Sequence, residues 1–358
     1  MGPTIASLTS GAKRAAYGAS QLARIIWYTG HYAYGRRVMG PLTEPGSAPY
    51  AEKFGPLDRE RLKTSFRELF RDDWKNIADG IYKFPGELRR TPSFSNLWRQ
   101  SRDYLRDAEK VAHRKHAHAH SEVLTDSHRE KYPRYYLQNF HYQTDGWLSD
   151  DSADRYDMQV ETLFTGAAGP MRRQSLPFIK AALEGHDVVQ AKMLDLGSGT
   201  GQFLDTVKEN WPGLNLTALD LSPAYLNKTR ASLGRWKGVD FVQANAEDTG
   251  LADEAYDVVT AVYLFHELPP KARENVAAEI ARLLKPGGSF ILADTIQYGD
   301  EPGFDILLEN FPRGFHEPYY NSFCSTDLEA MMGKHGLKRV DDKVAFLTKV
   351  TAFRKDGN

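Results

Sequence analysis

The feature that most constrains the fold of this chain is a glycine-rich segment, LDLGSGTG, at Leu194–Gly201. A short apolar run leads into three alternate glycines, and a helical pattern follows. Glycine permits a tight turn and lets the backbone approach a ligand with no side chain in the way. In open α/β sheets such a turn lies where ligands bind, beyond the carboxyl end of a strand. Taken alone, a glycine-rich turn is weak evidence, because it also occurs for purely structural reasons.

Beyond residue 192, short apolar runs alternate with helical patterns. The helical pattern over 272–284 should stop at the KPGG turn of Lys285–Gly288. This alternation predicts an α/β fold, a Rossmann-like, mostly parallel seven-stranded sheet with helices on both faces. The expected strands are 193–196, 214–219, 239–242, 257–262, 289–293, 337–339 and 344–353.

Polar side chains follow two of these strands. Asp220 ends the second expected strand, where a carboxylate can accept hydrogen bonds from ribose hydroxyls. Asn245 and Glu247 follow the third strand, and their oxygens can hold an adenine amino group. The pattern therefore predicts a nucleoside site at the carboxyl edge of the sheet.

This order of motifs resembles the class I S-adenosylmethionine-dependent methyltransferases and, within them, the ubiquinone/menaquinone-biosynthesis C-methyltransferase group. The matching segments are LDLGSGTG, the LDLS turn after the second strand, NAED, YDVV, FHELP and LLKPGG. The resemblance covers residues 190–295 and, more loosely, 134–358. It implies that S-adenosylmethionine is the cofactor. The cofactor-binding residues that it implies are Asp195, Gly197, Gly199, Gly201, Asp220, Leu221, Asn245, Ala246 and Glu247.

The resemblance also implies a role for each group. The three glycines would line the methionine portion, Asp195 would hold its ammonium, and Asp220 would bind the ribose. Asn245 departs from the pattern, because many relatives have aspartate there; the amide oxygen can still accept a proton. The spacing G-x-G-x-G, rather than G-x-G-x-x-G, argues against a dinucleotide, whose pyrophosphate rests on the helix start.

Methyl transfer from a sulfonium requires alignment and, for some acceptors, removal of a proton. No metal is required, and we expect none. His266 follows the fourth strand, where the substrate pocket should open, so it is our first candidate for the base; a strand-capping role is the alternative. His141 and His316 are alternative bases, and Tyr320 is a further candidate. Glu267 is interpreted as a structural partner.

Two aromatic segments, Tyr135–Trp147 and Gly303–Tyr320, are predicted to close over an apolar substrate. The same rings could instead pack the helical region onto the sheet. The favoured function is methyl transfer to a small hydrophobic acceptor, such as a prenylated ring, a quinone-like molecule or a lipid. O- or N-methylation of a polar metabolite is one alternative, and a non-catalytic cofactor-binding scaffold in a biosynthetic complex is another.

Residues 1–130 read as a helical N-terminal region, joined by a connector at 41–56 to further helices, and 131–358 as the cofactor-binding domain. No acidic residue precedes Glu44, and Ala23, Ile26, Trp27 and Tyr34 have roughly helical spacing. Packing on the protein's own core is the favoured interpretation of this arm. Contact with a membrane surface and a transit peptide are the alternatives.

Net charge and cysteine content limit the remaining possibilities for binding partners and cellular compartment. The formal net charge is -1, which offers no basic field for nucleic acid. The single cysteine fits a reducing compartment, and we expect a cytoplasmic protein, in contact with a membrane at most peripherally. The four histidines between 113 and 120 have basic neighbours and are interpreted as a solvated face. The oligomeric state stays open.

Overall fold

The computed structural model describes residues 9–40, 54–90 and 93–357. Its centre is a seven-stranded sheet with the order β3-β2-β1-β4-β5-β7-β6. The first five strands are parallel, and β7 runs antiparallel to both of its neighbours. This is the Rossmann-like architecture that the alternation predicted. The strands are β1 Lys192–Leu196, β2 Asn215–Asp220, β3 Val239–Gln243, β4 Tyr256–Val262, β5 Leu284–Thr295, β6 Leu337–Ala345 and β7 Thr348–Lys355.

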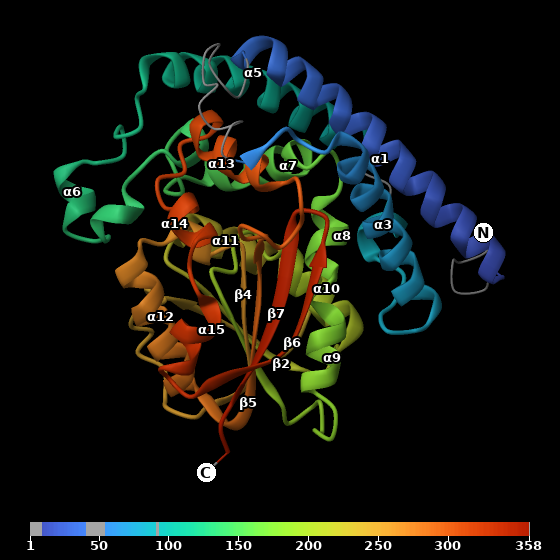
Figure 1. Cartoon of the computed structure of the whole chain (residues 1–358), viewed down its shortest axis with the longest axis vertical. Coiled ribbons are helices and arrows are strands. Elements are labelled where there is room, and N and C mark those ends of the chain that lie inside the picture. The colour runs from blue at the N-terminus through green and yellow to red at the C-terminus, as the bar shows by residue number, and fades with distance from the viewer. Residues whose placement is uncertain (1–8, 41–53, 91–92, 358) are drawn as a thin grey trace.

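Successive residues of a strand point to opposite sides of the sheet, and here both sides are buried. Met193 packs into one apolar cluster and Leu194 into the other. Helices α9 (Leu176–Ala182) and α10 (Gln202–Asn210) cover the first face. Helices α12 (Pro270–Leu283) and α15 (Leu328–Gly333) cover the second, as Figure 1 shows.

Two predicted boundaries were wrong. Strand β5 begins at Leu284 rather than Ser289, because Leu284 pairs with Tyr256 of β4 and the KPGG segment continues the strand after a register shift. Val344 belongs to β6 and not to the last strand. The hairpin turns at Phe346, whose φ of 60° lies in the left-handed region.

The described part of residues 1–130 is mainly helical, as predicted. Helix α1 packs against α5, α7 and α3, and it crosses the top of the molecule in Figure 1. The side chains of Thr9, Asp58 and Ser93 cap α1, α3 and α5. Most of the predicted connector at 41–56 lies outside the described residues, and the domain boundary near 130 stays a prediction. The elements are α1 Ser10–Met39, α3 Arg59–Ala78, α4 Gly86–Arg89, α5 Phe94–Ala117, α6 Asp126–Arg129, η2 Arg134–Tyr136, η3 Phe140–Tyr142, α7 Asp150–Leu163 and α8 Ala168–Arg173.

A buried ionic network fastens these helices to the sheet domain. Arg173 of α8 donates to both carboxylate oxygens of Asp73 on α3, at 2.8 and 2.6 Å. The hydroxyls of Tyr17 and Tyr82 donate to the same carboxylate, each at 2.6 Å. Arg173 also donates to Glu87 at 2.6 Å. Because every partner is satisfied, the charges can remain buried.

The outer face of α1 is apolar and exposed. Ile26 and Leu22 are 65% and 58% exposed, and Tyr34 is also exposed. The residues that α1 buries are instead Tyr17, Gln21 and Gly35. Thus α1 packs on the protein's own core, but through a different face from the one that the predicted stripe suggested. Among the described helices, none has an apolar stretch long enough to cross a membrane.

Candidate active site

The glycine-rich loop lies between β1 and α10, where the strand order reverses between β1 and β4. Gly197, Gly199 and Gly201 have φ of 71°, 58° and 80°, a region that favours glycine. The backbone N–H of Gly199 donates to Asp220 Oδ2 at 2.8 Å, which ties the loop to the end of β2. Within the described structure, the buried Oγ of Ser198 has no hydrogen-bond partner and is available to a ligand.

Polar groups continue along the ends of β2 and β3. Asn245 Oδ1 accepts the N–H of Glu247 at 3.0 Å, and Glu247 Oε1 accepts the hydroxyl of Tyr135 at 2.6 Å. The hydroxyl of Ser222 donates to the carbonyl of Trp147 at 2.5 Å. The segment predicted to roof the substrate therefore contacts the predicted cofactor residue Glu247 at its start, and at its end it contacts Ser222, which directly follows the predicted Leu221.

Two carboxyl groups of this region are buried in a way that suits a cationic ligand. Burial raises the pKa of Asp195 to about 7, while the hydrogen bond from Thr260 opposes this shift. Burial likewise raises the pKa of Asp220 to about 6 against the backbone hydrogen bonds that it accepts. A cation beside either group would favour its ionised form.

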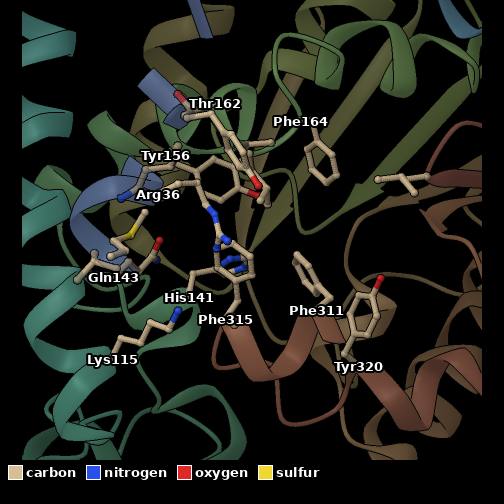
Figure 2. Close-up of a pocket in the computed structure, with 18 of the residues that line it drawn as sticks. Arg36, Lys115, His141, Gln143, Tyr156, Thr162, Phe164, Phe311, Phe315 and Tyr320 are labelled. Carbon is tan, nitrogen blue, oxygen red and sulfur yellow. The ribbon is translucent and has the colours of Figure 1, made fainter. Parts of the chain in front are cut away.

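A cavity of about 300 Å³ lies beside η4 (Phe265–Glu267), the turn that follows β4. Its walls come from α1, α5, α7 and α13 (Asp305–Gly314), together with Tyr320 at the start of α14 (Tyr320–Cys324). The lining is mostly apolar. Figure 2 shows Phe164, Phe311 and Tyr320 on one side of this cavity, with Arg36, Gln143 and Lys115 on the other.

Asp294, at the end of β5, fixes η4. One of its oxygens accepts the backbone N–H of Phe265 at 2.9 Å, and the other lies 2.5 Å from Nδ1 of His266. The ring of His266 is therefore oriented with Nε2 toward Glu267, whose Oε1 lies 3.6 Å away. Tyr320 packs edge-on against His266 and its hydroxyl bonds Thr295 at 2.6 Å.

Glu267 belongs to a second buried cluster. Nε2 of His141 lies 2.6 Å from Glu317 Oε1 and 3.7 Å from Glu267 Oε1. His141 has a φ of 55°, an unfavourable conformation for a residue with a side chain, which the surrounding contacts must maintain. Glu267 Oε2 is buried and has no hydrogen-bond partner in the described structure. Glu267 lines the cavity, and both oxygens of the neighbouring Glu317 are likewise buried without a hydrogen-bond partner among the described residues.

The charges of the cluster are interdependent. Burial would lower the pKa of His266, but the charge and hydrogen bond of Asp294, together with the charges of Glu267 and Glu317, raise it to about 9. Burial also opposes protonation of His141, and Glu317 raises its pKa to about 10. Burial and then the charge of Glu317 raise the pKa of Glu267 to about 7. At neutral pH both histidines are therefore protonated, and Glu267 is poised between its two forms.

Comparison with known proteins identifies the part of the chain that contains the glycine-rich loop. A methyltransferase-domain family model matches residues 193–288, from the start of the loop's strand to the KPGG segment. These residues form a methyltransferase domain. Its cofactor is S-adenosylmethionine, for which the partnerless Ser198 hydroxyl, the positive-φ glycines and the buried Asp195 and Asp220 provide a fitting site.

Two curated relatives show the range of this family. The chain is 26% identical to a malonyl-[acyl-carrier protein] O-methyltransferase of Geobacter sulfurreducens, over 52% of this chain and 72% of the relative. It is 29% identical to a ubiquinone/menaquinone biosynthesis C-methyltransferase of Methylobacterium nodulans, over 44% of this chain and 62% of the relative, which is less than two thirds of that protein. One name is that of an O-methyltransferase and the other that of a C-methyltransferase, so similarity alone does not fix the acceptor.

One solved structure that the chain matches is the N-methyltransferase NodS of Bradyrhizobium japonicum WM9 in complex with S-adenosyl-L-homocysteine. It has a TM-score of 0.39 and 14% identity, over 51% of this chain and 86% of that chain.

The methyltransferase domain contains all nine predicted cofactor residues. Leu221 and Ala246 are half-buried beside Asp220 and Glu247. Of the predicted catalytic residues, His266, His141 and Tyr320 line the cavity together. His316 does not line it: its Nε2 lies 2.8 Å from Gln138 Oε1, and its ring stacks on His120 at 4.1 Å. Their assignment to catalysis remains a prediction.

Sequence patterns did not single out Asp294, Glu317 or Arg36. Asp294 ends a buried strand, as Asp220 does, and the same signal could have identified it. Glu317 lies inside the predicted aromatic segment, where the rings drew attention away from the carboxyl group. Arg36 reaches the cavity only through the packing of α1 on α5, which no local pattern reveals.

The histidines between 113 and 120 form no candidate cation site in the described part of the chain. His141, Glu267 and Glu317 do bring three ligand atoms within 4.8 Å of one another. A chelator control therefore belongs with any experiment on Glu267.

Proposed function

We propose that the methyltransferase domain transfers a methyl group to a small, hydrophobic, ring-containing or lipid-like acceptor, and that Glu267 accepts the proton that this acceptor loses. The observation that carries the proposal is the buried Oε2 of Glu267, which has no hydrogen-bond partner among the described residues and belongs to a residue that lines a mostly apolar cavity. A general base works best when its pKa lies near the working pH. The pKa of about 7 for Glu267 meets this requirement.

When bound, S-adenosylmethionine supplies an electrophilic methyl group on a sulfonium leaving group. This methyl group would be transferred to an oxygen or carbon of the acceptor, with the neutral thioether as the leaving group. The displaced proton of the acceptor passes to Glu267. Protonated His141 and His266 lie within 4 Å of Glu267 Oε1 and stabilise its ionised form beforehand. This differs from the sequence-based choice of His266 as base, because Asp294 keeps His266 protonated.

Each remaining residue of the cluster has a supporting role in this proposal. Asp294 orients His266, and Glu317 holds His141. Neither Asp294 nor Glu317 lines the cavity, so both are positioning residues. The aromatic wall of Phe164, Phe311 and Tyr320 excludes water and favours an acceptor with a ring or an apolar tail.

Replacing Glu267 by glutamine tests the proposal. The amide keeps the shape but cannot accept the proton, so transfer of labelled methyl into a lipid and quinone extract should fall about 100-fold or more. Cofactor affinity, measured by calorimetry, should change less than about twofold. Glu329→Gln is the matched control, because Glu329 pairs with Arg339 on the surface.

Other outcomes discriminate the alternatives. Full transfer by Glu267→Gln would refute the role of Glu267. Wild-type transfer only to polar metabolites would favour the O- or N-methylating alternative. Cofactor binding without transfer to any fraction would favour the scaffold. Loss of activity on chelation, with recovery on adding a divalent cation, would replace proton transfer to Glu267 by metal assistance.

We further propose that α1 and α5 contact an anionic membrane surface, from which a hydrophobic acceptor could be drawn. The same two helices line the cavity, and their outer residues are apolar. No acidic residue occurs in α1, and Arg14 and Arg37 are exposed at either end of its outer face. An apolar strip flanked by cations is typical of interfacial helices. The exposed apolar residues are Leu22, Ile26 and Tyr34 of α1 and Trp98 of α5.

Vesicle sedimentation tests this contact. The protein should bind phosphatidylcholine vesicles more tightly when they contain phosphatidylglycerol, and Ile26→Ser should weaken binding about tenfold. Val340→Ser is the control, since Val340 is exposed on β6. Equal binding by both variants would contradict the proposal. Dimers that form without vesicles and disappear in Ile26→Ser would show that a second copy covers this face.

A further inference from the structure

A second polar part of the substrate cavity is formed by α1 and α5. Arg36 of α1 and Lys115 of α5 both line it, and Figure 2 shows them on the same side with Gln143. This end of the cavity is held in place by close helix packing. His31 of α1 bonds Ser101 of α5 at 2.8 Å, and a Cβ on Gly35 would lie only 2.6 Å from the hydroxyl oxygen of Tyr104. Arg36 directly follows this contact, so its backbone is fixed at the cavity wall.

The charge of Arg36 is not balanced locally. Within the described residues, no carboxylate lies within 4.0 Å of its guanidinium. The acid of this end is Asp107, and its two oxygens already accept the hydroxyl of Thr144 at 2.6 Å and the amide of Gln159 at 3.0 Å. Arg155 lies 3.8 Å from the same carboxylate. Asp107 is therefore satisfied without Arg36.

The end of the cavity beside η4 has a different balance of charges. There the two histidines face three carboxyl groups, those of Asp294, Glu317 and Glu267. The histidine end consequently holds no surplus of positive charge, whereas Arg36 at the end formed by α1 and α5 has no carboxylate partner among the described residues. An apolar wall between the two ends limits screening by water, so a charge on a bound molecule would distinguish them.

We propose that the acceptor carries an anionic group, a carboxylate or a phosphate, which binds Arg36 while its ring or apolar portion lies against Phe311 and Tyr320 beside Glu267. This inference rests on the proposed function and names its substrate class. A guanidinium presents two parallel N–H donors that match both anions. The acceptor is thus amphiphilic, with its reacting portion near η4 and its anion near α1.

A pair of probes of the same shape tests the inference. The 2-naphthoate anion and the neutral 2-naphthamide both present an aromatic ring, and they differ in charge. We expect wild-type protein to bind naphthoate more tightly than naphthamide in isothermal titration calorimetry. Arg36→Gln should weaken naphthoate binding about tenfold or more, the loss expected for a charge-assisted hydrogen bond. Its affinity for naphthamide should change less than about twofold.

Two control variants distinguish a specific contact with Arg36 from a general effect of the protein's net charge. Arg37→Gln removes the exposed neighbouring cation and should leave both affinities unchanged. Arg36→Lys keeps the charge but loses the paired donors, so its naphthoate affinity should fall between those of wild type and Arg36→Gln. If Arg36→Gln binds naphthoate as wild type does, or if Arg37→Gln loses as much, the inference is overturned.

The failure of this inference can be distinguished from failure of the proposed function. Glu267→Gln retains Arg36, so it should still bind naphthoate more tightly than naphthamide. Active Glu267→Gln together with weak naphthoate binding by Arg36→Gln would refute the base and retain the anion site. If wild type binds naphthamide and naphthoate equally and Arg36→Gln changes neither, the anion site alone is refuted. Absence of binding by both probes would overturn both.

Discussion

Replacing Arg173 by methionine should uncouple the N-terminal helices from the methyltransferase domain. Arg173 and Asp73 are almost completely buried, with side chains 2% and 0% exposed. Methionine fills a similar volume but removes two hydrogen bonds to Asp73 and one to Glu87. It leaves two carboxyl groups without their cation, while Tyr17 and Tyr82 still donate to Asp73.

The magnitude follows from these contacts. Three charge-assisted hydrogen bonds at about 1.5–3 kcal/mol each give an upper bound, because either carboxyl can be protonated and so neutralised. Removing one partner of a buried pair costs about 3–5 kcal/mol, and we expect a loss of stability in this range. Urea unfolding followed by circular dichroism, and the decrease in Tm, would measure it.

A surface ion pair supplies the control. Arg89 is 46% exposed and lies 3.5 Å from Glu209, so Arg89→Met should cost no more than about 1 kcal/mol. Equal effects of Arg173→Met and Arg89→Met would refute the reasoning. So would full stability of Arg173→Met at neutral pH, because the buried carboxyl groups would then have no need of their cation.

Two pH dependences follow from the buried carboxyl groups. Cofactor affinity should fall about tenfold from pH 8 to pH 6, because Asp195, with its raised pKa of about 7, must be ionised to hold an ammonium; calorimetry showing equal or tighter binding at pH 6 would contradict this. Turnover at saturating cofactor should rise as the pH increases through about 7, since Glu267 must be deprotonated, and a rate that falls over this range would contradict the role of Glu267.

The cofactor half of the site could be predicted from sequence because its residues lie close together along the chain. A strand that ends in alternate glycines specifies its own turn, and an acid at the end of the next strand must lie at the same edge of the sheet. The register confirms this adjacency, since Asp195 pairs with Ala218 and Leu196 with Leu219 of the strand that ends at Asp220. The local sequence pattern and the topology of a parallel sheet are therefore sufficient to predict the cofactor half of the site.

The acceptor half could be predicted only in part. The aromatic segments do reach the cavity, through His141, Phe311 and Phe315. However, the pairing of His141 with Glu317 joins residues 176 positions apart and depends on the positive φ of His141. No periodicity encodes such a contact. The exposed face of α1 was misassigned for a similar reason, because small residues leave the helical pattern ambiguous until the packing partner is known.

The two halves of the site come from different parts of the chain. The methyltransferase domain at 193–288 contributes His266 and Glu267, so the proposed proton transfer would take place within the part of the chain that the family model matches. The walls that select the acceptor lie outside that span: Arg36 and Lys115 precede it, and Phe311 and Tyr320 follow it. The family model that matches the glycine-rich loop does not extend to these walls. The acceptor of this chain must be inferred from the walls, and they combine aromatic rings at one end with an unbalanced cation at the other.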